Sequence, residues 1–150
     1  MDLLYLQTHW ALVRTGLVET ISKFNDAELD FKPFPTFWSV RQLMLHIAQE
    51  ELGEFNYGIT QTLMEFPPDY PPVAYPTVES ILALLESVHA PIHAYVENLE
   101  EAELGRTITT PWGASYTLLD MLGHLIEHEI HHRAELSLIL GMLGREGLNA

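Results

Sequence analysis

Apolar residues recur at steps of three and four along four stretches of the chain, a spacing that places them on one face of an α-helix. These stretches cover about residues 2–24, 39–63, 77–99 and 117–143. Prolines and glycines separate them and provide the turns between helices. The pattern therefore predicts an all-α four-helix bundle that forms a single domain over residues 1–150.

Two helix-capping patterns and one run of β-branched residues add detail to the predicted bundle. Ser39–Gln42 and Thr117–Asp120 each place a capping hydroxyl three residues before a polar side chain, as at the start of a helix. The β-branched run Thr107–Thr110 precedes the turn Pro111–Gly113. This segment is compatible with a short hairpin before the last helix.

The charge of the chain limits the classes of partner that it is expected to bind. It carries 21 acidic and 7 basic residues, a formal net charge of −14. A surface this acidic repels phosphate backbones and anionic headgroups, so neither nucleic acid nor a membrane is expected as a partner. The N-terminus has no basic region before an apolar stretch, so it does not read as a signal peptide, and the cytoplasm is the expected location.

Four of the eight histidines lie between positions 124 and 132. On a helix, residues four apart differ by about 40° around the axis, so His124, His128 and His132 form a ladder on one side. Side chains at that spacing can converge on one ion, and imidazole is a common ligand of transition metals. With no cysteine in the chain, the remaining ligands must offer nitrogen or oxygen. The ladder therefore predicts a metal site.

Further ligands must come from another helix. His46 is the best candidate, because it stands in an apolar run where a buried imidazole needs a partner. Glu50 lies one turn further along, and Glu129 lies beside the ladder. These two carboxylates and His124 are candidates for orienting a ligand or carrying a proton. His9, His89 and His93 have no comparable support and are expected at the surface or as filler.

Two metalloenzyme signatures overlap in this segment. Residues 128–132 form H-E-x-x-H, the zinc peptidase motif, but the metzincin extension fails because Glu135 and Leu138 stand where it needs glycine and histidine. Glu129 and His132 form E-x-x-H, a di-iron signature that requires a second copy on another core helix. The sequence offers no such second copy, so neither interpretation is favoured.

Three stretches resemble the DinB/YfiT-like superfamily of small metalloenzymes. They are residues 32–46, residues 110–113 and residues 124–133, and their order and spacing match over nearly the whole chain. The resemblance implies a four-helix bundle, commonly a homodimer, with metal held by one histidine on the second helix and an H-x-x-x-H pair on the fourth. Those positions fall on His46, His128 and His132. Zinc or nickel is the expected metal, and iron and manganese are alternatives.

The resemblance leaves the activity open, because some relatives are thiol S-transferases or thiol-dependent isomerases and others have no known reaction. Three imidazoles leave an ion a free position, as in catalytic zinc sites. The first hypothesis is a metal-dependent transferase that activates a low-molecular-weight thiol for transfer to an electrophile. The second is a hydrolase that uses metal-bound water. The third is a non-enzymatic dimeric stress-response or binding module with a structural metal.

A further apolar stripe supports the dimer expectation. Leu122, Ile126, Ile130 and Leu140 lie on the side of the last helix away from the ladder. A helix that is apolar on two faces is expected to be buried on both. We therefore expect this helix to contact the bundle core on one face and a second subunit on the other.

Overall fold

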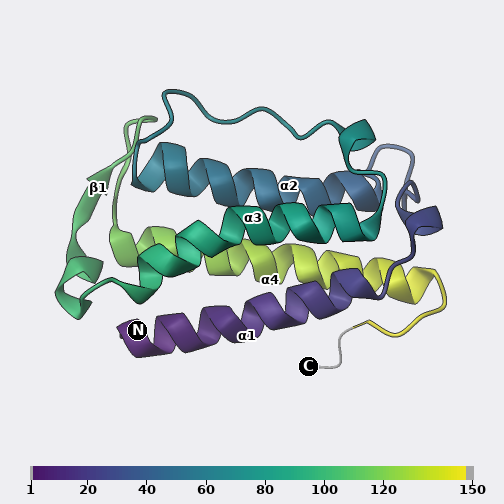
Figure 1. The fold of residues 1–150 in the computed structure, drawn as a ribbon, viewed down its shortest axis with the longest axis horizontal. Helices are drawn as coiled ribbons and strands as arrows, with labels where there is room; N and C mark the ends of the chain where they lie inside the picture. Colours follow the sequence, from purple (N-terminus) through teal and green to yellow (C-terminus); the bar gives the residue numbers. More distant parts are fainter. Residues whose placement is uncertain (1, 148–150) are drawn as a thin grey trace.

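Four long helices dominate the computed structural model, which describes residues 2–147 (Figure 1). They are α1 (Leu3–Ser22), α2 (Val40–Gly53), α3 (Val78–Glu97) and α4 (Leu118–Met142). The shorter elements are η1 (Asp26–Glu28), η2 (Glu54–Ile59), η3 (Pro72–Ala74), η4 (Glu101–Gly105), β1 (Thr107–Thr109) and β2 (Ser115–Thr117). The predicted four-helix bundle is confirmed, as is the hairpin, in which β1 and β2 pair antiparallel with Ile108 opposite Tyr116.

The helices run in an up-down-down-up order. Figure 1 shows α1 and α4 side by side and pointing the same way, with α2 and α3 pointing the other way. Parallel neighbours need a long return connection, and residues 60–77, which we call the crossover segment, run back along α2. The hairpin at the opposite end of α3 reverses the chain into α4. The beginning of α4 therefore lies beside the end of α2.

Side chains at the helix starts explain where α2 and α4 begin. The Ser39 hydroxyl accepts from the Gln42 amide at 3.2 Å, and the Gln42 side chain accepts from the Ser39 amide at 3.0 Å. Thr117 and Asp120 make the same reciprocal pair at 3.1 and 3.0 Å. Each pair satisfies two amides that have no partner within the helix.

The end of α2 differs from the prediction, which carried this helix as far as Leu63. The α-helix ends at Gly53 and continues as the π-helix η2 to Ile59. Gln61 then takes a left-handed conformation with φ of 54°, which helix-forming residues rarely adopt. At Gly53 an added Cβ would lie 2.3 Å from Cζ of Phe66, so this glycine lets the crossover segment pack directly on α2.

The apolar residues of α4 are buried within the chain's own core. Leu122 and Leu140 are fully buried, Ile126 is 3% exposed and Ile130 packs partly buried against the same core. The stripe that suggested a second subunit is thus covered by the bundle itself, and it gives no evidence for a dimer contact. Within the described residues, no helix combines the length and apolar character that crossing a bilayer requires.

Candidate metal centre

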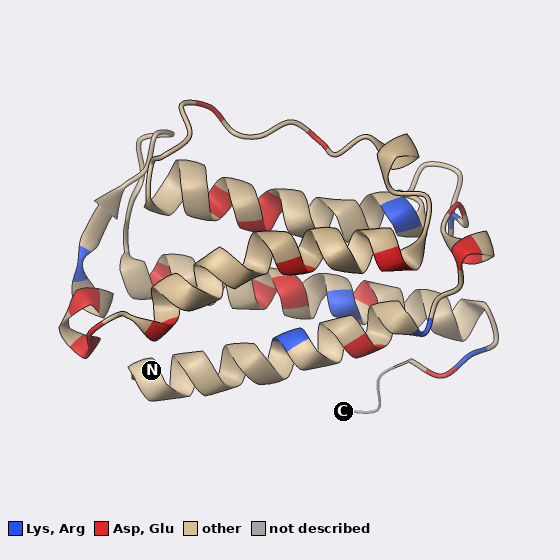
Figure 2. Cartoon of the chain, in the orientation of Figure 1, with Lys and Arg blue, Asp and Glu red and all other residues tan. Residues whose placement is uncertain are grey.

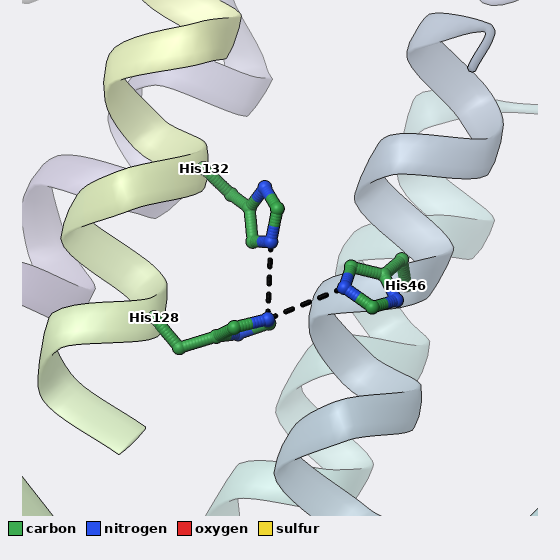
Figure 3. Close-up of side chains that lie close together, drawn as sticks. All are labelled: His46, His128 and His132. Atoms are coloured by element: carbon green, nitrogen blue, oxygen red, sulfur yellow. Dashed lines mark hydrogen bonds between the residues drawn. The ribbon is translucent and has the colours of Figure 1, made fainter. Parts of the chain in front are cut away.

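Three imidazoles from two helices converge between α2 and α4 (Figure 3). Nε2 of His128 lies 3.0 Å from Nε2 of His132 and 3.3 Å from Nε2 of His46. His128 and His132 are one turn apart on α4, and His46 faces them from α2. The structure therefore brings together the three residues that the sequence analysis named as ligands.

A carboxylate fixes the orientation of one ring. Nδ1 of His132 lies 2.6 Å from Oε2 of Glu135, and because a carboxylate accepts, the hydrogen stands on Nδ1. A neutral His132 then presents the lone pair of Nε2 to the other two rings. Metal-binding histidines commonly have such a partner on the other nitrogen. From the sequence, Glu135 was interpreted only as a mismatch to a peptidase motif, although its three-residue spacing from His132 was a usable signal.

The pKa of each of the three rings is lowered, which favours the neutral form. Burial is the largest cause for His128, and together with the neighbouring His132 and His46 it lowers the pKa of this ring to about 3. Burial and the neighbouring His132 also lower the pKa of His46, and burial lowers that of His132. Neutral imidazoles offer lone pairs, which is the form that binds a metal. The donor set fits a divalent transition-metal ion, because three imidazole nitrogens converge.

The site borders a small cavity on the side of α2. This cavity has a volume of about 140 Å³, and its wall includes His46, Trp38, Asp69 and Tyr70. The ring of Trp38 lies over that of His46, with 4.4 Å between their centroids. Asp69 and Tyr70 belong to the crossover segment, so that segment closes one side of the centre.

Two of the proposed accessory residues lie near the three rings. Oε1 of Glu50 is 3.9 Å from Nδ1 of His46, close but beyond hydrogen-bond distance. Burial raises the pKa of Glu50, an effect that His124 partly offsets. His124 continues the ladder, with 6.4 Å between its ring centroid and that of His128. His124 thus stands one turn away from the convergence point rather than in it.

Glu129, the other proposed accessory residue, faces a different part of the bundle. Its Oε1 accepts from Trp10 Nε1 at 2.9 Å and from Arg14 Nη1 at 2.9 Å, both residues of α1. Its Oε2 is buried and has no hydrogen-bond partner among the described residues. The interpretation of Glu129 as a neighbour of the metal is wrong, because its helix position directs the carboxylate toward α1.

Glu129 belongs to a buried network that the sequence analysis missed. The network comprises Arg14, Glu51, His89 and Glu129. Arg14 Nη1 donates to Oε2 of Glu51 at 3.1 Å, and Nδ1 of His89 lies 2.6 Å from Oε1 of Glu51. His89 was expected at the surface or as filler, and it is buried, with 7% of its surface exposed, and bound to Glu51. Its four-residue step from buried Leu85 was the signal that it lies on the apolar stripe of α3.

The fold and the three converging rings define a four-helix-bundle protein with a candidate histidine metal-binding site. The family model described as the DinB superfamily matches residues 9–136, and the chain belongs to that family. The chain is 25% identical over 134 residues to a protein of Oceanobacillus iheyensis named "putative metal-dependent hydrolase". That alignment covers 83% of this chain and 77% of the relative.

Solved structures share the same fold. The DinB-like protein YjoA of Bacillus subtilis matches with a TM-score of 0.73 and 22% identity, over 97% of this chain and 95% of that one. YfiT of Bacillus subtilis, described as a probable metal-dependent hydrolase with an unusual four-helix bundle topology, matches with a TM-score of 0.71 and 22% identity. That match covers 94% of this chain and 87% of YfiT. A mycothiol-dependent maleylpyruvate isomerase matches with a TM-score of 0.65 and 17% identity, over 88% and 60% of the two chains.

Proposed function

We propose that this protein is a metal-dependent enzyme that transfers a low-molecular-weight thiol to an electrophilic substrate. His46, His128 and His132 would hold one divalent ion, with zinc or nickel favoured by the imidazole donors. The observation that carries the proposal is the convergence of three neutral rings with a cavity at their edge. When bound, such an ion lowers the pKa of a water or a thiol that it contacts.

The composition of the chain determines the source of the thiol in this proposal. The protein contains no cysteine, so a thiol nucleophile must arrive as a cosubstrate. In the transfer, the thiol loses its proton, its sulfur forms a bond to carbon, and the leaving group departs. Glu50 is a candidate to accept this proton, because it is half-buried beside His46 and its pKa is raised. The name of the mycothiol-dependent relative is consistent with thiol use in this fold.

Hydrolysis is the second candidate. It is favoured by the names of the Oceanobacillus iheyensis relative and of YfiT, both of which refer to metal-dependent hydrolysis. The same three ligands would serve, with water in place of the thiol. Glu50 would then accept the proton of that water. The two candidates therefore differ in cosubstrate rather than in the residues that form the centre.

Metal content and a thiol-conjugation assay test the proposal together. Tag-free protein should contain about one equivalent of zinc or nickel by elemental mass spectrometry, and His128→Ala should lose it. His93→Ala is the matched control, since His93 is a partly exposed histidine on α3 that is remote from the three rings. Conjugation of small thiols to 1-chloro-2,4-dinitrobenzene should require the metal. Conjugation that survives a chelator would refute thiol transfer by this centre, and ester turnover without thiol would favour hydrolysis.

A further inference from the structure

A second, larger cavity lies beside the metal centre, where the start of α4 meets the hairpin and η2. Its volume is about 640 Å³, which is large enough for a small organic molecule. His124 lines it, and this residue stands one turn before His128 on the same face of α4. The cavity therefore opens within one helical turn of a metal ligand.

Aromatic and apolar side chains form part of the wall. Trp112 at the hairpin turn is 46% exposed and Tyr116 on β2 is 44% exposed, so both rings have free surface. Trp112 is held by the π-helix: an added Cβ at Gly58 would lie 2.9 Å from Cη2 of Trp112. π-Helical turns are frequent at functional sites, and here the turn lets the tryptophan approach the backbone closely.

The charged part of the wall is acidic. Glu54, Asp120 and Glu127 line the cavity, and no lysine or arginine does. The carboxylates of Glu54 and Glu127 have no hydrogen-bond or ion-pair partner within residues 2–147, whereas Asp120 is engaged in capping α4. Arg106, which directly follows η4, donates to the hydroxyl of Tyr95. Figure 2 shows how far acidic positions outnumber basic ones over the whole chain.

Gly123 is an unexpected residue in the interior of α4. A glycine inside a helix costs about 0.5–1 kcal/mol relative to alanine. No neighbour requires it here, because an added Cβ would meet no atom within 4 Å. Gly123 lines the cavity, so its missing side chain leaves the space open. Gly123 thus adds to the room that a ligand would have in the cavity.

We propose that this cavity binds the cationic organic part of a substrate, an ammonium or guanidinium group attached to an apolar body. The faces of Trp112 and Tyr116 attract a cation through their quadrupoles, and unpaired carboxylates attract it by charge. An anionic group would meet repulsion from the same carboxylates. The assignment of this ligand as a substrate rests on the proposed function, but its binding does not.

The proposal is tested by comparing the binding of a cation with that of neutral and anionic compounds of similar size. Isothermal titration calorimetry would compare benzyltrimethylammonium with neutral benzyl alcohol and anionic benzenesulfonate at fixed ionic strength. We expect the cation to bind with a dissociation constant below about 10 mM, and at least about tenfold more tightly than benzyl alcohol or benzenesulfonate. Equal binding of the anion, or no binding of the cation at about 10 mM, would overturn the proposal.

Two variants locate the binding. Gly123→Leu fills the cavity from a position with free space, and it should weaken cation binding at least about tenfold. The matched control is Gly141→Leu, an exposed glycine of the same helix at which an added Cβ also meets no atom within 4 Å. Glu54→Gln keeps the shape and removes a charge, and it should weaken binding about three- to tenfold. Unchanged affinity in both cavity variants would overturn the proposal.

The metal and the cavity can be tested separately. His128→Ala removes a proposed ligand of the ion but no residue that lines the cavity, so cation binding should persist in that variant. Cation binding in a protein that takes up no metal would leave the cavity proposal standing and refute the proposed function. Metal uptake without preferential cation binding would refute the cavity proposal and leave the proposed function standing.

Discussion

The lowered pKa values of the three rings predict that the metal-free protein loses stability as the pH falls. Burial and the other two histidines lower the pKa of His128 to about 3, from an ordinary value of 6.5. In the unfolded chain this ring is free to bind a proton near pH 6.5, while in the folded chain it is not. Between these two values the unfolded state therefore binds more protons, and the free energy of unfolding must fall as pH falls.

The size of the effect follows from this difference in pKa. Between pH 8 and pH 5, a ring with these two values reduces the free energy of unfolding by about 2 kcal/mol. Because His128 is only partly buried, solvent screening reduces this contribution to about 1 kcal/mol. His46 and His132 act in the same direction, since the pKa of each is also lowered.

Replacing His128 tests this reasoning directly. In chelator-treated protein, His128→Ala should reduce the loss of unfolding free energy between pH 8 and pH 5 by about 1–2 kcal/mol. Urea unfolding followed by circular dichroism at both pH values measures the difference. A comparison within each variant across pH cancels the packing that the substitution removes.

His93→Ala is the control, because it removes a partly exposed histidine that does not face the three rings. Its pH dependence should match that of the unmodified protein. If His128→Ala and His93→Ala gave the same change between pH 8 and pH 5, the three rings would not be neutral in the folded state. The fit of this site to a metal would then lose its electrostatic basis.

Three further predictions concern residues around the centre. Glu135→Gln should weaken zinc binding about 10- to 100-fold in a chelator competition, because the partner of His132 Nδ1 is altered, and unchanged affinity would refute that role. Arg14→Met leaves two carboxylates buried without their cation and should lower the free energy of unfolding by about 3–5 kcal/mol in urea, whereas a loss below about 1 kcal/mol would contradict the network. Gly58→Val should displace Trp112 and cost about 1–3 kcal/mol, seen as a changed near-ultraviolet circular dichroism spectrum, and an unchanged spectrum would contradict the close packing.

The helices were predictable because their information is local. The period of the apolar residues places each helix, and the reciprocal pairs at Ser39 and Thr117 mark two of the starts. The end of α2 was not predictable in this way. It depends on Phe66 packing against Gly53 and on Trp112 packing near Gly58, contacts between segments far apart in the chain. The spacing of residues within one helix does not predict such contacts.

The candidate site, too, was predictable only where the information is local. The four-residue steps on α4 indicate that His128 and His132 share a face, but they cannot show that His46 lies opposite. That placement requires the direction of α2 relative to α4, which the crossover segment and the hairpin set. The polar residues of the core were harder to predict. Arg14 and His89 occupy positions that the period assigns to apolar residues, and only their partners explain why they are buried.

The buried network and the metal centre are connected through the geometry of one helical turn. Successive residues on a helix point about 100° apart, so the direction of Glu129 constrains that of His128. Trp10 and Arg14 hold Glu129 toward α1, and His128 is thereby directed away from α1 and toward His46 on α2. The network joins side chains from all four helices, since Glu51 and His89 complete it. A centre whose rings must meet within a few ångströms thus depends on polar contacts made on a neighbouring face of the same helix.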